Sequence, residues 1–193
     1  MIKKFLVAAL TAVVFASSAE ALSVKHDFTA FVGPFNASTA EFEYTLTKKS
    51  YAVRSVVRTN GTFGFLYPFE ANYYTGGSIE GDRLETSAYR YTSQSRFNKR
   101  SKVMIYNEDG QPVFAVSSKN GREKKKEIEA TADSKNTTNL QTVLAAIARQ
   151  YNLVGFCDSR IPIFDGKRRF DAIFRDEGKE EIKANEYSAF AGR

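Results

Sequence analysis

The sequence contains very few of the residues on which most enzyme and metal sites depend. Among its 193 residues there is one histidine, His26, one cysteine, Cys157, and no tryptophan. A single histidine in a strand-like stretch excludes a histidine-based triad, a histidine-rich zinc site and an HExxH helix. One cysteine cannot form a zinc or iron–sulfur cluster, and no GxxxxGK[ST] phosphate loop occurs. The sequence therefore predicts a protein that binds rather than catalyses, without a metal or cofactor.

Long hydrophobic runs are missing as well, apart from one at the N-terminus. A basic start, Met1–Lys4, precedes an apolar run from Phe5 to Ala16, and small residues follow at Ala19 and Ala21. This order is typical of a secretory signal peptide, here residues 1–21. As a helix the apolar run would span roughly 18 Å, too little for a hydrocarbon core of about 30 Å. We therefore expect an exported protein of the Gram-negative periplasm, with no transmembrane segment after cleavage.

Positive charge is in excess and clustered. The formal net charge is +6, and basic residues gather in residues 96–102, in 119–126 and in the run Lys167, Arg168 and Arg169. In an exported protein the natural anionic partners are lipid headgroups, lipopolysaccharide and acidic polysaccharides rather than nucleic acid. The last run supplies our candidates for contact with an anionic surface. The alternative interpretation is that these side chains only decorate turns and exposed strand faces.

Most of the chain alternates between apolar and polar residues. Residues 41–47 place Phe42, Tyr44 and Leu46 on one face, and residues 51–58 repeat the pattern after a short connection. A two-residue period is typical of half-buried strands, and so short a connection predicts an antiparallel hairpin. Asn-Gly and Asp-Gly pairs in other connections are typical of tight hairpin turns. Further strands are predicted near residues 24–32, 83–93, 101–106, 112–118, 124–131, 160–164, 168–175 and 181–188.

One segment has a helical period instead. Apolar residues recur every three or four positions and predict an amphipathic helix over about 140–151, with Asn139 as its N-cap and Gly155 just past its end. Its polar side is expected to carry Gln141, Thr142, Arg149 and Gln150. Together the elements predict a mainly β fold in one domain, residues 22–193. We expect a single antiparallel, strongly curved sheet or half-open barrel, with this helix packed against it.

An aromatic segment interrupts the alternation. Residues 61–74 are rich in phenylalanine and tyrosine, and Pro68 with two glycines prevents a regular central strand through the whole piece. One interpretation is the lining of a groove for acyl chains or sugar rings. The other is a strand, a bend and a strand whose aromatic side chains plug one end of the sheet. The groove candidates are Phe63, Phe65, Leu66, Tyr67 and Phe69, together with Leu144 of the predicted helix.

Two stretches of the chain resemble a known bacterial family. They are residues 58–69, RTNGTFGFLYPF, and residues 164–171, FDGKRRFD; the approach to the helix, residues 133–147, is a looser match. They are similar to the family catalogued as domain of unknown function 3108, over most of the chain after the signal. The resemblance implies an exported or envelope-associated β-rich protein and carries over no catalytic residue. A looser fold-level similarity to lipoprotein carriers implies a curved antiparallel sheet with an apolar interior.

A single cysteine is unusual in an oxidising compartment. The resemblance to this family implies a further cysteine and more strands beyond residue 193. We therefore expect Cys157 to form a disulfide with a partner that is absent from this chain. The alternative is a buried free thiol that behaves as a small apolar residue.

The hypothesis for function is a non-enzymatic envelope protein that binds an apolar or lipidic ligand in a groove. One helix presents too little apolar surface to cover a sheet of about ten strands, so we expect a cavity of at least ~300 Å³ between helix and sheet, unless the sheet closes and fills its interior. Two alternatives stay open. One is a carbohydrate-binding or polysaccharide-export accessory protein, and the other is a purely structural interaction domain.

Overall fold

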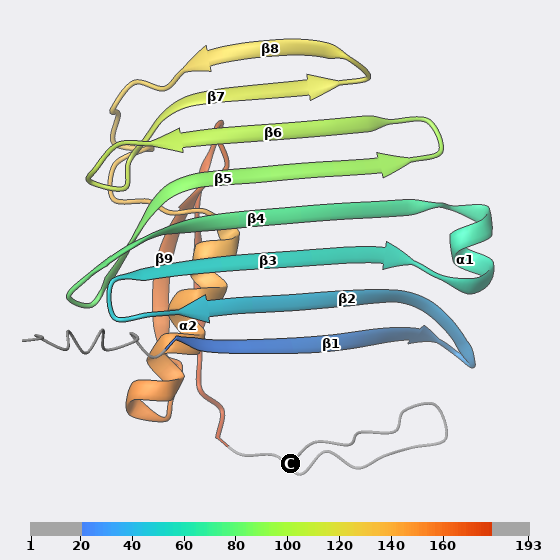
Figure 1. The fold of residues 1–193 in the computed structure, drawn as a ribbon, viewed down its shortest axis with the longest axis horizontal. Helices are drawn as coiled ribbons and strands as arrows, with labels where there is room; N and C mark the ends of the chain where they lie inside the picture. The colour runs from blue at the N-terminus through green and yellow to red at the C-terminus, as the bar shows by residue number, and fades with distance from the viewer. Residues whose placement is uncertain (1–20, 179–193) are drawn as a thin grey trace, which may run out of the picture.

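The protein forms an open antiparallel sheet with a helix and a separate hairpin on one face (Figure 1). The computed structural model describes residues 21–178, so residues 1–20 of the expected signal peptide and the expected strand at 181–188 lie outside the described residues. Eight strands follow one another across the sheet in sequence order, and two more form the hairpin. The elements are β1 (Leu22–Val32), β2 (Phe35–Leu46), β3 (Ser50–Thr59), α1 (Gly61–Leu66), β4 (Phe69–Glu80), β5 (Arg83–Ser95), β6 (Lys99–Tyr106), β7 (Pro112–Lys119), β8 (Arg122–Glu127), α2 (Leu140–Val154), β9 (Ser159–Phe164) and β10 (Arg169–Phe174).

The hairpin expected from the clearest alternation is present as β2 and β3. Tyr44 pairs with Val53 and Leu46 with Tyr51, and all four side chains are buried together with Ala145 of α2. We call the face of the sheet that carries them the inner face, and the opposite one the outer face. The predicted fold class is confirmed as mainly β, with a curved antiparallel sheet and a helix packed on it. The sheet is open, because β1 and β8 are its two ends.

The second predicted hairpin, β9 and β10, covers another part of the inner face. Phe170 pairs with Ile163 across it, and residues 165–168 form its turn. The loop before α2 is joined to β9 through Thr138. The Thr138 N–H group donates to the carbonyl of Pro162, and the Thr138 carbonyl accepts from the N–H group of Phe164. A second core cluster lies beneath this hairpin. It consists of Met104, Tyr106, Ala115, Ile128 and Phe164.

One helix and one strand were missed by the sequence patterns. Residues 61–66 form the short helix α1, and residues 69–80 form the central strand β4; for residues 61–74 we expected either a groove lining or a strand, a bend and a strand, without bounds for a strand that continues to Glu80. The second half of β4 contains a bulge at Gly76 and Gly77. A Cβ atom at Gly77 would lie 1.8 Å from the backbone oxygen of Glu85, so glycine is required there. Glycines lower the strand signal of a sequence, which is why this strand escaped the alternation argument.

Neither helix within residues 21–178 has the length and apolar character needed to cross a bilayer.

The turn between β9 and β10 provides a test of the fold. Gly166 has a φ of +93°, in the region that residues with a Cβ atom rarely adopt. We expect Gly166→Val to lower the free energy of unfolding by about 1–2 kcal/mol, measured by thermal or chemical denaturation. Gly166→Asn is the matched control, and its loss should be smaller because asparagine tolerates positive φ better. Equal stability of the valine variant and the unchanged protein would contradict this turn geometry.

Candidate functional site

Helix α2 has defined signals at both of its ends. The Asn139 side chain accepts hydrogen bonds from the backbone N–H groups of Gln141 and Thr142, at 3.0 and 3.1 Å. Gly155 closes the helix in the left-handed conformation, with a φ of 78°. Asparagine and glycine are preferred at these two positions, so both predicted cap residues are confirmed.

A buried cluster of hydroxyl and amide groups joins the start of α2 to the sheet. Thr142 Oγ1 lies 2.9 Å from the Tyr51 hydroxyl oxygen and 3.0 Å from Thr86 Oγ1. The Asn139 amide donates to Thr75 Oγ1 at 3.1 Å. Burial raises the pKa of Tyr51, so its hydroxyl keeps its proton over an even wider pH range than that of an exposed tyrosine. We call these residues the hydroxyl cluster. Because buried polar groups need partners, the cluster fixes the rotation of α2 about its own axis.

This rotation differs from the one that periodicity predicted. We expected Gln141 and Thr142 on the side of the helix that points away from the sheet, and this was wrong: they are only 5% and 1% exposed. Ser55 Oγ donates to Gln141 Oε1 at 2.7 Å, which gives the amide a partner on the sheet. The apolar periodicity of a helix gives no information about hydrogen-bond partners on strands that are distant in the sequence. The apolar stripe is therefore divided: Val143 is buried and Ala148 packs against the core, whereas Leu140 and Tyr151 stay more than half exposed beside the helix–sheet contact.

The rest of the stripe forms one wall of an apolar groove between α2 and strands β1–β4. The groove has a volume of about 670 Å³, within the range of roughly 300–1,000 Å³ that is typical of ligand sites. Phe28, Leu140 and Tyr151 are 59%, 53% and 54% exposed. The main lining side chains are His26, Phe28, Phe42, Tyr44, Val57 and Tyr73 from the strands, with Leu140, Leu144, Ile147, Ala148 and Tyr151 from α2. A cavity between helix and sheet is thus present as expected.

Several polar groups of the groove are already paired. Ser55 and Gln141 bond to each other. Alternation directs the Glu41 carboxylate to the outer face, where it contacts Lys25 Nζ at 3.4 Å and Arg58 Nη1 at 3.0 Å. The hydrogen bond and charge of Lys25, with a smaller effect of Arg58, hold the pKa of Glu41 below its usual value. The groove therefore offers mainly apolar contact.

His26 and Cys157, each the only residue of its type in the chain, both line this groove. The His26 ring lies 6.2 Å from that of Phe28 and 6.3 Å from that of Tyr44, between ring centroids. Cys157 is a half-buried free thiol among the described residues, so its expected disulfide stays a prediction. In residues 21–178 no group of three His, Cys, Asp or Glu side chains could hold a metal ion. Sequence reasoning placed neither residue here, although alternation in β1 puts His26 and Phe28 on one face.

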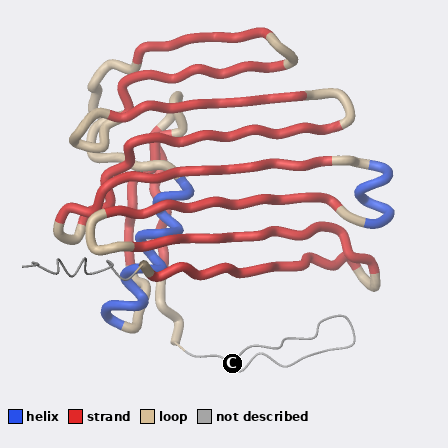
Figure 2. The backbone as a smooth tube through the Cα atoms, in the orientation of Figure 1, coloured by secondary structure: helices blue, strands red, loops and turns tan. Residues whose placement is uncertain are grey.

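The aromatic candidates do not lie with Leu144. Helix α1 connects the ends of β3 and β4 that lie away from α2 (Figures 1 and 2). The candidates in α1 or directly after it are Phe63, Phe65, Leu66, Tyr67 and Phe69. Phe65 and Tyr67 are 77% and 71% exposed. Of the residues predicted for the groove, only Leu144 lines it, so the expectation that the aromatic residues and Leu144 share one groove is corrected. The cause is the folding of residues 61–66 into a local helical connection.

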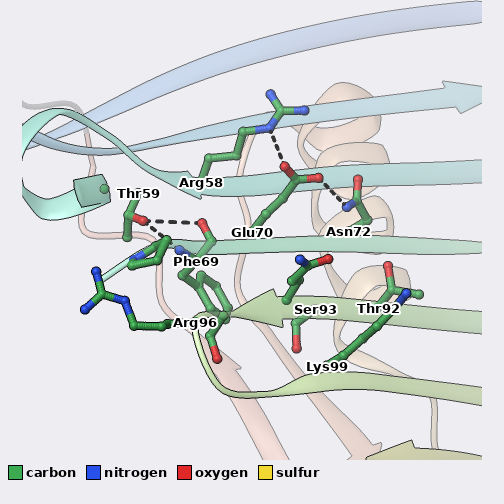
Figure 3. Close-up of a pocket in the computed structure, with 13 residues that line it drawn as sticks. Arg58, Thr59, Phe69, Glu70, Asn72, Thr92, Ser93, Arg96 and Lys99 are labelled. Carbon is green, nitrogen blue, oxygen red and sulfur yellow. Dashed lines mark hydrogen bonds and ion pairs between the residues drawn. The ribbon is translucent and has the colours of Figure 1, made fainter. Parts of the chain in front are cut away.

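A second pocket, of about 560 Å³, lies beside α1 (Figure 3). Its carboxylate, Glu70, lies 3.3 Å from Arg58 Nε and accepts a hydrogen bond from the Asn72 amide at 3.0 Å. The Asn72 hydrogen bond, helped by Arg58, lowers the pKa of Glu70. An ionised and already paired carboxylate is a poor acid or base near neutral pH. This pocket therefore gives no support to a catalytic role.

The three predicted basic residues lie at the β9–β10 turn but have different environments. The Asp165 carboxylate accepts hydrogen bonds from the backbone N–H groups of Lys167 and Arg168, at 2.7 and 2.9 Å. The Arg169 guanidinium donates to two backbone carbonyls of the loop before α2, at 3.0 and 2.8 Å. Arg169 thus holds a loop in place, whereas Lys167 lines a recess on the inner face.

Comparison with known proteins identifies a family. The model of the family described as "Protein of unknown function (DUF3108)" matches residues 27–192. No curated protein and no solved structure matches the chain. The looser fold-level similarity to lipoprotein carriers therefore stays a prediction.

The hydroxyl cluster can be tested by removing one oxygen. Thr142→Val keeps the shape of the side chain but leaves the hydroxyls of Tyr51 and Thr86 with fewer partners. We expect a loss of about 1–3 kcal/mol in the free energy of unfolding, measured by chemical denaturation. Thr92→Val, an exposed position on β5, is the matched control and should change stability by no more than about 0.5 kcal/mol. Similar losses in both variants would show that the cluster does not hold the helix.

Proposed function

The chain belongs to the DUF3108 family, and from the geometry of its own inner face we propose that it binds the acyl chain of a lipidic ligand, without catalysis, outside the cytoplasm. The proposal depends above all on the apolar groove beside α2, in which large apolar side chains remain half exposed. The signal-peptide pattern of residues 1–21 supports an exported location. The occupant we propose is therefore an envelope lipid.

The exposed side chains of the groove lie on both of its walls. Phe28 belongs to β1, and Leu140 and Tyr151 lie at the two ends of the helical stripe. Contact with an apolar ligand would remove all three from water at once, which favours binding. Large apolar side chains gathered around one concavity are typical of a binding site rather than of an ordinary surface.

The size of the groove suits an acyl chain. Burying one methylene group is worth about 0.8 kcal/mol, so a chain of about ten carbons could supply several kcal/mol after the costs of ordering. The ligand would thus gain most of its affinity from its tail. No strong hydrogen bond in the groove is needed for this.

A sugar is a poorer fit to the same surface. Sugar hydroxyls require hydrogen-bond partners when they leave water, and an unmet hydroxyl costs free energy. In this groove Ser55 already donates to Gln141, and the Glu41 carboxylate is directed to the outer face, where it is engaged by Lys25 and Arg58. These observations favour an acyl chain over the carbohydrate alternative.

The proposal is tested by the binding of an environment-sensitive fatty-acid probe to the purified mature protein. We expect Leu144→Asp to weaken binding at least about tenfold, because a carboxylate on the groove wall would have to lose water when the acyl chain enters. Phe65→Asp is the matched control: it introduces the same charge at an exposed position of α1, and probe affinity should not change. Both variants are first compared with the unchanged protein by circular dichroism and melting temperature.

The only cysteine gives an independent measurement. Cys157 lines the groove and is half buried, so an acyl chain in the groove should slow its alkylation by a thiol reagent. Absence of any protection by fatty acids, together with absence of probe binding, would reject the acyl-binding proposal and favour a purely structural role.

A further inference from the structure

The inner face changes character from one side of the sheet to the other. Across β6, β7 and β8, Lys102 pairs with Ser117, which pairs with Lys124. Two residues further along each strand, and so on the same face, Arg100 pairs with Lys119 and Lys119 with Arg122. Cross-strand neighbours on one face lie about 5 Å apart, so these registers gather the cations closely. Lysine and arginine therefore occupy the same face that carries the apolar groove on β1–β4.

These cations line a recess of about 960 Å³, which we call the basic recess. Its basic side chains are Arg100, Lys102, Lys119, Arg122, Lys124 and Lys167. No aspartate or glutamate is part of the lining. None of the ion pairs found within residues 21–178 involves one of these cations. Like charges held together without a counter-charge repel each other, and an anion in the recess would relieve this repulsion.

Two contacts fix the side of the recess formed by the β9–β10 turn. Lys102 Nζ donates to the backbone carbonyl of Asp165 at 2.6 Å, which holds the turn against β6. The Asp165 carboxylate in turn caps the backbone N–H group of Lys167. Partial burial opposes ionisation of Asp165, but the backbone hydrogen bonds from Arg168 and Lys167, followed by the Lys102 charge, outweigh it and lower the pKa of Asp165. The turn therefore places Lys167 next to the cations of the sheet.

Tyrosines connect the basic recess to the apolar groove. Tyr73, Tyr89 and Tyr91 line the recess, and Tyr73 also lines the groove. The ring centroids of Tyr73 and Tyr91 are 5.0 Å apart. Burial raises the pKa of both Tyr73 and Tyr89, so neither hydroxyl adds negative charge to the recess. The two concavities thus adjoin at one aromatic side chain.

From this juxtaposition we infer that the basic recess binds the phosphate headgroup of the same ligand whose acyl chain lies in the apolar groove. The inference rests on the proposed function and specifies its ligand as an anionic, phosphate-bearing amphiphile. The tail would lie between α2 and β1–β4, the headgroup over β6–β8, and the join beside Tyr73.

A phosphate monoester fits the donors of the recess better than a neutral or zwitterionic headgroup does. The guanidinium groups of Arg100 and Arg122 can each donate two parallel hydrogen bonds to phosphate oxygens. The lysine ammonium groups add positive charge, and the Ser117 hydroxyl adds a neutral donor. A quaternary ammonium headgroup would meet no carboxylate in this lining.

The test compares three probes with the same acyl chain, each below its micelle concentration: lysophosphatidic acid, lysophosphatidylcholine and monoacylglycerol. Binding to the mature protein is measured by displacement of the fatty-acid probe. We expect lysophosphatidic acid to bind at least about tenfold more tightly than monoacylglycerol at low salt, with a smaller preference at high salt because exposed charges are screened. The affinity of lysophosphatidylcholine should lie close to that of monoacylglycerol.

Two double variants distinguish binding of the phosphate in the basic recess from general electrostatic attraction to a positively charged protein. Arg122→Gln with Lys124→Gln removes two cations of the recess, and lysophosphatidic acid should then bind about three- to tenfold more weakly, with monoacylglycerol unaffected. Arg90→Gln with Lys125→Gln is the matched control, because alternation places both exposed side chains on the outer face. This control should leave all three affinities unchanged.

The outcomes distinguish the headgroup inference from the proposed function. Equal affinity for lysophosphatidic acid and monoacylglycerol, or equal losses in both double variants, would overturn the headgroup inference and leave acyl binding in place. Binding of none of the three acyl probes would overturn both. Inorganic phosphate serves as the last arm: if it displaces lysophosphatidic acid completely at micromolar concentration, the recess is a site for free phosphate and the inference of one shared ligand is wrong.

Discussion

Tyr51, Thr75, Thr86, Asn139 and Thr142 come from three strands and from the start of α2, and their polar atoms meet in one buried cluster. A buried hydroxyl without a partner costs free energy, so α2 can begin in one place and with one rotation. That rotation directs Gln141 and Thr142 at the sheet and leaves Leu140 and Tyr151, the two ends of the apolar stripe, at the side of the contact. Hydrogen bonding thus contributes to the apolar groove, because the buried places of Gln141 and Thr142 leave the stripe residues Leu140 and Tyr151 more than half exposed at its wall.

The rest of the inner face is divided by the two elements that cover it. Helix α2 lies over the core of β2 and β3, and the β9–β10 hairpin lies over the core around Met104 and Phe164. Figures 1 and 2 show both elements crossing the strands toward one end of the sheet, which leaves the other end without a helix above it. The apolar groove and the basic recess adjoin this uncovered area. Incomplete coverage by two elements therefore produces both concavities.

Local patterns in the sequence predicted most of the fold. Strict alternation around Tyr44 and Val53 predicted β2 and β3, and the Asn139 cap with Gly155 predicted the ends of α2. The central strand β4 escaped because Pro68 precedes it and Gly76 and Gly77 bulge within it. The sequence marked residues 61–74 as an aromatic segment that interrupts the alternation. Its separation from α2 could not be derived, because that depends on the order of the strands in the sheet.

The candidate site was less predictable than the fold because it depends on register. The run of β8 residues at 122–127 reads as a solvated strand, and nothing local shows that Lys124 faces Ser117, with Lys102 beyond it. Likewise, the rotation of α2 follows from hydroxyls on strands far away in the sequence. Alternation along β8 places Arg122 and Lys124 on the inner face of the sheet and Lys125 on the outer face. A single strand thus contributes cations both to the basic recess and to the ordinary charged outer surface, and only the first set shares a face with the apolar groove.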